Sequence, residues 1–213
     1  MTERLQALGN FIIDRPALRS LKTADDSVFL TFDDGPDPNT TPQVLDLLRD
    51  SQAKACFFVV AQKAQKYPQL IQRIVQEGHS LGNHSLDHKY SPFFRHRRYL
   101  RQWIDSSKTL IEEIAKTPTV GFRPPSGILT PELIALEKAS PLPLILWNHR
   151  FFDALLPWSP SRAQKSLNRL RPGDIVLLHD FQSPKLRPQF LNTLEFYLEE
   201  IHRSSHVARE LRL

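Results

Sequence analysis

The stretch Thr31-Phe32-Asp33-Asp34-Gly35-Pro36 decides how this chain is interpreted, because it places two adjacent carboxylates at the end of an apolar run. The apolar residues Val28–Leu30 before it and the Gly-Pro turn after it predict a buried strand that stops at the carboxylates. Two carboxylates in that position repel each other and are costly to desolvate. We therefore expect a neutralising group beside them, and a metal ion is the usual one.

Two histidines further along the chain supply matching ligands. His84 and His88 are four residues apart in His84-Ser85-Leu86-Asp87-His88, a spacing that would place both imidazoles on one side of a helical turn. One aspartate and two histidines form a three-ligand set that leaves a fourth position open for water. Such a set is typical of catalytic rather than structural metal sites.

Length and composition indicate one globular domain. The chain has 213 residues, 40% hydrophobic and 24% charged, values that suit a single domain with a sizeable core. The one cysteine, Cys56, lies in an apolar run and is expected to be a buried, inert thiol. No apolar stretch is long enough for a membrane span. Residues 1–20 lack the uninterrupted apolar core of a signal peptide, so we expect a cytoplasmic location, with export by a removed or unrecognised leader left open.

Short apolar runs alternate with helical patterns, which predicts a parallel sheet with crossover helices. The expected strands are Val28–Phe32, Ala55–Val60, Ser80–Asn83, Val120–Arg123, Leu142–Trp147, Asp174–His179 and a last one near Val207–Leu213. The expected helices are Pro42–Ser51, Ala64–Glu77, Arg97–Lys116, Pro131–Ala139, Ser161–Leu170 and Pro188–His202. We expect an α/β fold, a distorted or incomplete (β/α) barrel of about seven parallel strands. Residues 1–213 would form one domain, with residues 1–24 as an N-terminal extension.

Polar side chains follow several of these expected strands. Parallel sheets place their chemistry at the C-terminal ends of the strands, so such residues are expected to meet at one mouth. The residues at or just past these ends are Asp33, Asp34, His84, Arg123, Trp147 and His179.

A basic and aromatic segment follows the second histidine and accounts for part of the net charge of +5. It can be a solvated helix face with an apolar underside, or a docking surface for an anionic or aromatic-stacking polymer. No nucleic-acid recognition motif is present, so a nucleic-acid partner is not expected. The segment contains Lys89, Tyr90, Phe93, Phe94, Arg95, Arg97, Arg98, Tyr99, Arg101 and Trp103.

The chain resembles the polysaccharide deacetylase family, also known as the NodB-homology domain or carbohydrate esterase family 4, from about Val28 to Asp180. Four motifs carry the resemblance, namely the first three of the family and its last one; the fourth, which lies between them, matches poorly. They are TFDDGP at Thr31–Pro36, the H-S-x-x-H segment within Glu77–His88, the R-x-P-Y-G-like Phe122–Gly127, and Ile175–Asp180 with its histidine. Their order and spacing make the combined signal specific.

The resemblance implies roles for the residues at these motifs. Asp34, His84 and His88 would bind a divalent ion, most simply Zn²⁺, with Co²⁺ or another first-row ion also suited to these ligands. The ion would lower the pKa of water and polarise an acetyl carbonyl. Asp33 would act as general base, and His179 would protonate the departing amine.

The remaining implied roles concern the surroundings of the reaction. Arg123 would lie near Asp33 and hold it ionised. The backbone N–H of Ser126, a residue that stands where tyrosine is usual, would help to stabilise the oxyanion. Asp180 could orient His179. Substrate contacts are expected from Pro125, Ser126, Trp147 and Asp153, although Trp147 is also compatible with a core position.

The fourth motif departs from the family pattern. In Trp147–Ala154, Arg150 replaces an aspartate and Ala154 replaces a tryptophan. Asp153 remains available to pair with Arg123. The substrate groove is therefore expected to differ from the family's usual one.

The favoured function is a metal-dependent hydrolase that removes N-acetyl groups from an amino-sugar polysaccharide or oligosaccharide, such as a chitin-type or peptidoglycan glycan. Acetyl esters on sugars are a close variant. Two alternatives stay open: a small-molecule carbon–nitrogen hydrolase of the same superfamily, and a glycan-binding protein that has lost turnover. The sequence does not indicate an oligomeric state.

Overall fold

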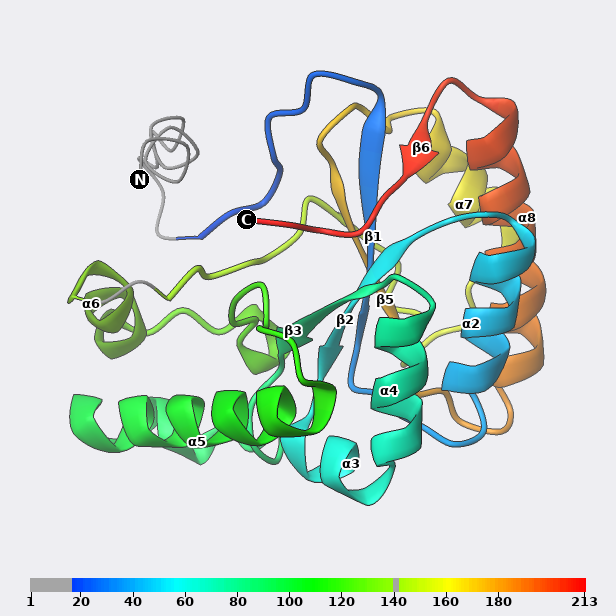
Figure 1. The fold of residues 1–213 in the computed structure, drawn as a ribbon. Helices are drawn as coiled ribbons and strands as arrows, with labels where there is room; N and C mark the ends of the chain where they lie inside the picture. Colours follow the sequence, from blue (N-terminus) through cyan, green and yellow to red (C-terminus); the bar gives the residue numbers. More distant parts are fainter. Residues whose placement is uncertain (1–16, 140–141) are drawn as a thin grey trace.

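The structure is a computed structural model that describes residues 17–139 and 142–213 (Figure 1). The predicted N-terminal extension, residues 1–24, thus lies mostly outside the described residues. Every helix within the described ranges is too short or too polar to cross a lipid bilayer.

A sheet of parallel strands forms the centre of the fold. Its strand order is β3-β2-β1-β5-β4, and every strand pair is parallel. β1 lies in the middle and is buried along its whole length, because it is covered on both faces, as parallel strands usually are. The strands are β1 (Ser27–Asp33), β2 (Ala55–Val59), β3 (Ser80–Asn83), β4 (His149–Arg150), β5 (Ile175–His179) and β6 (Val207–Ala208), which pairs with the start of β1.

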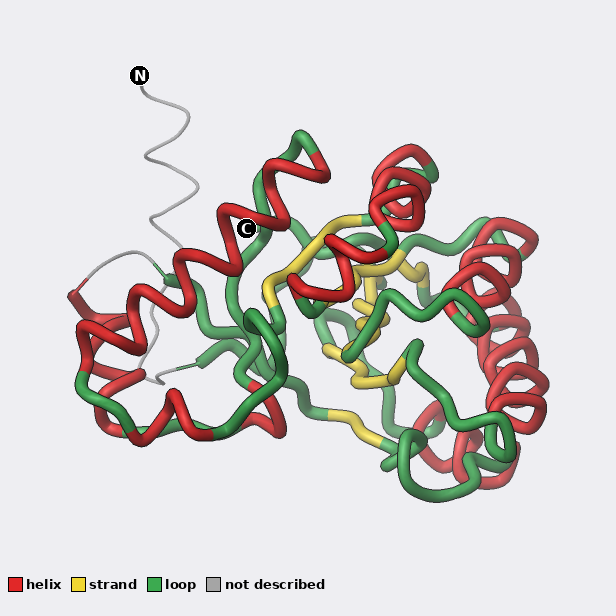
Figure 2. Tube along the Cα trace, turned by 90° about the horizontal axis from the view of Figure 1, so that it is seen from below, coloured by secondary structure: helices red, strands yellow, loops and turns green. Residues whose placement is uncertain are grey.

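Helices lie around this sheet, as Figures 1 and 2 show from two directions. Each buries an apolar stripe against the strands or a neighbouring helix; in the first helix, for example, Val44, Leu45 and Leu48 are buried. The helices are α2 (Thr41–Asp50), α3 (Ala61–Lys66), α4 (Pro68–Gln76), α5 (Arg97–Ala115), α6 (Pro131–Ala139), α7 (Pro160–Leu167) and α8 (Arg187–Arg203). Two short 3₁₀ turns, η1 (Ser91–Phe94) and η2 (Pro125–Gly127), lie in the loops.

The predicted helix Ala64–Glu77 is wrong, because the structure has two helices there. α3 ends at Lys66 and α4 begins at Pro68. Tyr67 between them has φ −129° and ψ 58°, outside the helical region. A residue that precedes proline is sterically pushed out of that region, which explains the break.

Two predicted strands form only isolated bridges in the described residues. Phe122 pairs with Asn83 on one side and with Leu144 on the other, in place of continuous strands at Val120–Arg123 and Leu142–Trp147. Proline at positions 124 and 143 removes backbone donors at this edge, so a longer ladder cannot form. The predicted α/β fold with an incomplete barrel is confirmed, with six named strands in the described residues instead of about seven.

The C-terminal ends of the strands face one side of the molecule, toward the viewer in Figure 2. Asp33 ends β1 and is the direct neighbour of His179 at the end of β5. Asn83 ends β3, immediately before His84. The fold thus brings the polar residues of separate strands to a common edge.

Candidate metal centre and active site

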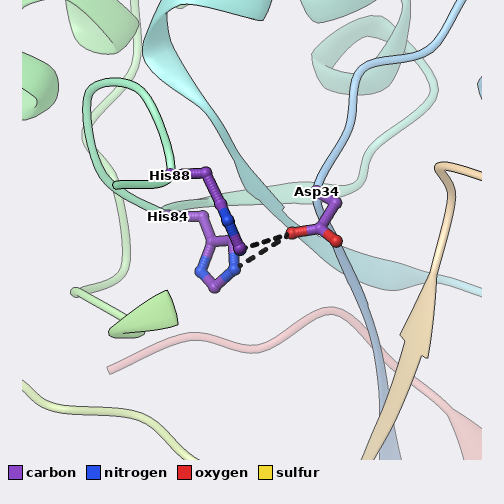
Figure 3. Close-up of side chains that lie close together, drawn as sticks. All are labelled: Asp34, His84 and His88. Carbon is purple, nitrogen blue, oxygen red and sulfur yellow. Dashed lines mark ion pairs between the residues drawn. The ribbon is translucent and has the colours of Figure 1, made fainter. Parts of the chain in front are cut away.

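Asp34, His84 and His88 lie together just beyond the ends of β1 and β3 (Figure 3). The Oδ1 atom of Asp34 is 3.3 Å from Nε2 of His84 and 3.0 Å from Nε2 of His88. All three potential ligand atoms are within 4.8 Å of one another. Zinc bonds of about 2.0–2.1 Å in a tetrahedron would hold two ligand atoms about 3.3 Å apart, so this spacing suits a single shared ion.

The two histidines are brought together by a loop, and the expected helical turn is wrong. Ser85 and His88 have φ of 81° and 58°, values that interrupt a helix. Side chains close the loop instead. Ser85 N–H donates to Oδ1 of Asn83 at 2.8 Å, and His88 N–H donates to Oγ of Ser85 at 3.0 Å. Such local side-chain bonds compete with helix formation.

Two residues of the three-residue cluster have left-handed backbone conformations. Asp34 has φ 72° and His88 has φ 58°, although neither is glycine. Left-handed conformations of non-glycine residues cost free energy and persist where the surrounding structure enforces them, commonly at functional sites. Asp34 and His88, two of the three potential ligands, therefore adopt backbone conformations that are unfavourable locally and that bring their side chains into the cluster.

A hydrogen bond to the backbone orients the His84 ring. Nδ1 of His84 lies 2.8 Å from the carbonyl oxygen of Arg123. A carbonyl can only accept, so Nδ1 carries the proton and donates it. The neutral ring then has its lone pair on Nε2, which faces Asp34, as metal-binding histidines require.

The burial and electrostatics of Asp34 also fit a cation. Its Oδ1 atom is buried and accepts no hydrogen bond from the described residues. Burial opposes ionisation, yet the imidazoles of His84 and His88 outweigh it and hold the pKa of Asp34 well below its usual range. For His84, burial lowers the pKa, but the carboxylates of Asp33 and Asp34 raise it overall. An ionised carboxylate without an aligned donor, beside two imidazole nitrogens, is a donor set that suits zinc.

Asp33 is held by a buried arginine, as the sequence indicated. Nη1 of Arg123 donates to Oδ1 of Asp33 at 2.7 Å and to Oγ1 of Thr31 at 2.7 Å. The other oxygen of Asp33, Oδ2, lies 3.7 Å from Nε2 of His84. Asp33 thus uses one oxygen for its ion pair and turns the other toward the histidine cluster.

Arg123 itself has no solvent exposure, so its charge must be compensated within the protein. Its Nε and Nη2 atoms donate to the carbonyl oxygens of Ile145 and Leu146 at 3.1 and 3.0 Å. The guanidinium carbon also lies 3.9 Å from the centroid of the Phe58 ring. These contacts fix the plane of the guanidinium and with it the position of the Asp33 carboxylate.

Asp153 pairs with His179, and its expected pairing with Arg123 is wrong. Oδ1 of Asp153 is 3.0 Å from Nδ1 of His179, and Oδ2 accepts from the His179 backbone N–H at 2.8 Å. Gln182 donates to the same Oδ2 at 3.2 Å. Burial lowers the pKa of His179, but the charge and hydrogen bond of Asp153 outweigh it and raise that pKa to about 9.

Asp180 does not orient His179 in the way the sequence suggested. It is fully buried and accepts from Oγ1 of Thr41 at 2.5 Å. Its carboxylate packs so closely against Gly35 that an added Cβ there would overlap it. Burial raises the pKa of Asp180 to about 7. This residue therefore supports the turn that follows Asp34.

Three of the four groove residues predicted from the sequence, Pro125, Ser126 and Trp147, lie around the third motif, whereas Asp153 is buried against His179. Pro125 is buried and Ser126 is exposed, with φ 55°. Trp147 is partly buried and packs against Gly127, where an added Cβ would lie 2.8 Å from the Trp147 ring. A residue that was not predicted for the site, Tyr90, places its hydroxyl 3.0 Å from Oγ of Ser126.

Lys63 is a second site neighbour that sequence patterns did not indicate. Its Nζ donates to the backbone carbonyl of Asp34 at 2.7 Å and lies 3.6 Å from the centroid of the Phe181 ring. One side chain of α3 thus connects the loops that follow β1 and β5. No local sequence signal marks such a role, because its partners are distant in the chain.

The basic and aromatic segment has the apolar underside that its first interpretation predicts, and its use as a docking surface stays a prediction. Phe93 and Trp103 are buried, at 1% and 6% exposure, and form the apolar underside. Tyr90, Phe94 and Tyr99 are exposed. The apolar residues therefore divide between the core and the surface.

Comparisons with known proteins agree with this geometry. The family model described as polysaccharide deacetylase matches residues 20–144. A peptidoglycan-N-acetylglucosamine deacetylase of Bacillus cereus is 35% identical over 157 residues, which cover 72% of each chain. A chitooligosaccharide deacetylase of Sinorhizobium fredii is 30% identical, with 89% of this chain and 92% of the relative covered.

Solved structures show the same fold. The structure of a peptidoglycan N-acetylglucosamine deacetylase superimposes with a TM-score of 0.82 and 25% sequence identity, covering 93% of this chain and 91% of the other. The similarity therefore extends well beyond the motifs around the histidine cluster.

Proposed function

Because the chain belongs to the polysaccharide deacetylase family, we propose that it is a zinc-dependent hydrolase that removes N-acetyl groups from an amino-sugar glycan. Two relatives, named for peptidoglycan and chitooligosaccharide deacetylation, support this substrate class. The observation that carries the proposal is the combination of a three-ligand cluster with Asp33 and His179 on neighbouring strands.

Asp34, His84 and His88 would hold the ion, since their ligand atoms share one small volume. When bound, zinc supplies Lewis-acid polarisation of the amide carbonyl and lowers the pKa of water. Co²⁺ or another first-row ion is compatible with the same donors. Three protein ligands leave room for water and substrate, which a fully closed structural site would not.

Asp33 would take the proton from the attacking water. Its Oδ1 is occupied by Arg123 at 2.7 Å, whereas Oδ2 faces the cluster. A general base must lie within reach of the proton that it removes and must be ionised beforehand. The buried guanidinium of Arg123 restricts the carboxylate to one orientation, with Oδ2 turned toward the cluster.

His179 would donate a proton to the departing amine. With a pKa of about 9, the ring is protonated at neutral pH, as a general acid must be. Nδ1 is held by Asp153 at 3.0 Å, so the proton available to the substrate is on Nε2. In the whole reaction, water adds to the acetyl carbon, the C–N bond breaks, and the products are acetate and a free amine.

Substrate contacts would come from the third and fourth motifs. The backbone N–H of Ser126 is proposed to donate to the developing oxyanion, and Pro125 and Trp147 to form part of the groove wall. Arg150, which is exposed and lies with its guanidinium carbon 4.3 Å from the centroid of the Phe152 ring, replaces the aspartate of the family's fourth motif and is proposed to change the groove wall. This altered wall is the feature that favours the second candidate, a glycan-binding protein without turnover.

Acetate release tests the proposal directly. Purified protein is incubated with N-acetylated chito-oligosaccharides, peptidoglycan fragments and small acetylated amides, each with added Zn²⁺ or with a chelator. We expect release from a glycan that stops with the chelator and returns with zinc. Glycan binding without acetate in any condition would favour the second candidate, and hydrolysis of small amides alone would reject a glycan as the substrate.

A further inference from the structure

We propose that Tyr90 is a substrate-contacting residue, and that its ring and the hydroxyl pair it forms with Ser126 bind a neutral sugar unit beside the metal ligands. This inference rests on the proposed function and assigns it a specificity-determining position. Nothing in the sequence motifs marks Tyr90, which lies in the basic and aromatic segment.

The position of Tyr90 is set by the same loop that carries His88. The Tyr90 ring lies 5.7 Å from the His88 ring, edge-on at 72°. Its carbonyl accepts from the Phe93 N–H at 3.1 Å, and Pro92 and Phe93 are buried. The backbone is therefore anchored from below, while the side chain remains 45% exposed.

The hydroxyl of Tyr90 extends across to the third motif. It lies 3.0 Å from Oγ of Ser126, a residue from a loop that is distant in sequence. Two hydroxyls that share one hydrogen bond still offer one donor and several acceptor lone pairs. A phenol from another loop thus lies beside the third motif, in which Ser126 stands where tyrosine is usual.

The chemistry of this pair fits a sugar. An exposed aromatic ring offers an apolar surface for the C–H face of a pyranose, and the paired hydroxyls can bond its hydroxyl groups. The ammonium group of Lys89, the residue before Tyr90, forms an ion pair with Asp87 at 2.8 Å. The uncharged ring and the two uncharged hydroxyls are the groups that match a neutral sugar.

Tyr99 provides a matched comparison. It is equally exposed, at 45%, and also lies edge-on to a histidine, with 6.3 Å between its ring and that of His96. It belongs to α5, outside the metal-ligand loop. A general effect of removing a surface tyrosine from this segment would therefore appear in both variants, whereas a substrate contact would appear only at Tyr90.

The test compares Tyr90→Ala, Tyr90→Phe, Ser126→Ala and Tyr99→Ala in the full chain. We expect Tyr90→Ala to raise KM for an N-acetylated chito-oligosaccharide about tenfold with kcat nearly unchanged, since a lost uniform contact acts on KM. Tyr90→Phe and Ser126→Ala should each raise it about threefold, the usual effect of one neutral hydrogen bond. Tyr99→Ala should match wild type, and zinc content should be equal in all variants.

Calorimetric binding of the same oligosaccharide to chelator-treated protein separates this inference from the proposed function. If wild type binds the glycan but releases no acetate when zinc is added back, the proposed function fails, and the dissociation constants of the variants still test the role of Tyr90. Wild-type affinity in Tyr90→Ala, an equal loss in Tyr99→Ala, a loss that follows zinc content, or no binding by wild type would each overturn the inference.

Discussion

The pairing of Asp153 with His179 makes a quantitative prediction for the variant Asp153→Asn. The substitution keeps the shape of the side chain and removes its charge. In the native site, burial lowers the pKa of His179, and the Asp153 carboxylate, followed by Asp33 and Asp34, raises it. Without the adjacent carboxylate, burial is opposed only by the two other carboxylates.

The expected change is large. The pKa of His179 is about 9, against an ordinary value of 6.5, and this difference corresponds to about 3 kcal/mol in favour of the protonated ring. We expect Asp153→Asn to lower the pKa by about two pH units or more. The alkaline limb of the pH–rate profile should move to lower pH, because His179 must be protonated to act as the acid.

The sign of the stability effect follows from the same values. The folded-state pKa is raised, so the ion pair stabilises the fold fully below about pH 6.5 and loses this contribution as pH rises through about 9. The difference in unfolding free energy between wild type and Asp153→Asn should therefore shrink across that interval. Urea denaturation at several pH values measures it.

The pKa itself is measured by NMR titration of the histidine ring signals in metal-free protein. Asp174→Asn is the control, because Asp174 forms a comparable pair with His149 at 2.9 Å and has no contact with His179. We expect this control to leave the His179 titration unchanged. If His179 in Asp153→Asn titrates within about half a pH unit of wild type, the assignment of its raised pKa to this carboxylate is refuted.

The remaining predictions concern the ligands, the loop connection and packing. Asp33→Asn should stop acetate release with zinc content unchanged, whereas His84→Ala should lose zinc by elemental analysis; normal rates in the first or full zinc in the second would reject the assigned roles. Lys63→Met removes a hydrogen bond and a cation–π contact, so zinc affinity in a chelator competition should fall about tenfold and recover in Lys63→Arg. Gly82→Ala would place a Cβ 2.2 Å from the Phe58 ring, so the unfolding free energy should fall by about 1–3 kcal/mol. An unchanged urea midpoint would contradict the close contact between Gly82 and Phe58.

Much of the sheet could be predicted from the sequence because its strands are short apolar runs between turn residues. Ser80–Asn83 was predicted with its observed ends, and Ala55–Val60 to within one residue. The split at Tyr67 was also predictable in principle from the proline that follows it. Edge segments such as Val120–Arg123 have the same apolar pattern as continuous strands. They differ from them only in the backbone N–H donors that nearby prolines remove and in the few bridges that they form.

The residues of the candidate site were easier to predict than their partners. Motif order identified Asp34, His84 and His88 without any knowledge of their geometry. The four-residue spacing of the histidines suggested a helical turn, yet positive φ values produce the proximity instead. The partner of His179 could not be inferred, because Asp153 reaches it from a different strand end and the adjacent Asp180 was the simpler choice.

The pairing of β6 with β1 has a consequence for biosynthesis. Arg209 donates from Nε to Oγ of Ser27 at 2.9 Å across 182 sequence positions, and β5, the long neighbour of β1, is also far along the chain. In a nascent polypeptide, β1 therefore lacks its partners β5 and β6 until residues 175–208 have been translated. We therefore expect the protein to depend on chaperones during translation. We also expect nonsense mutations even a few codons before position 207 to impair folding.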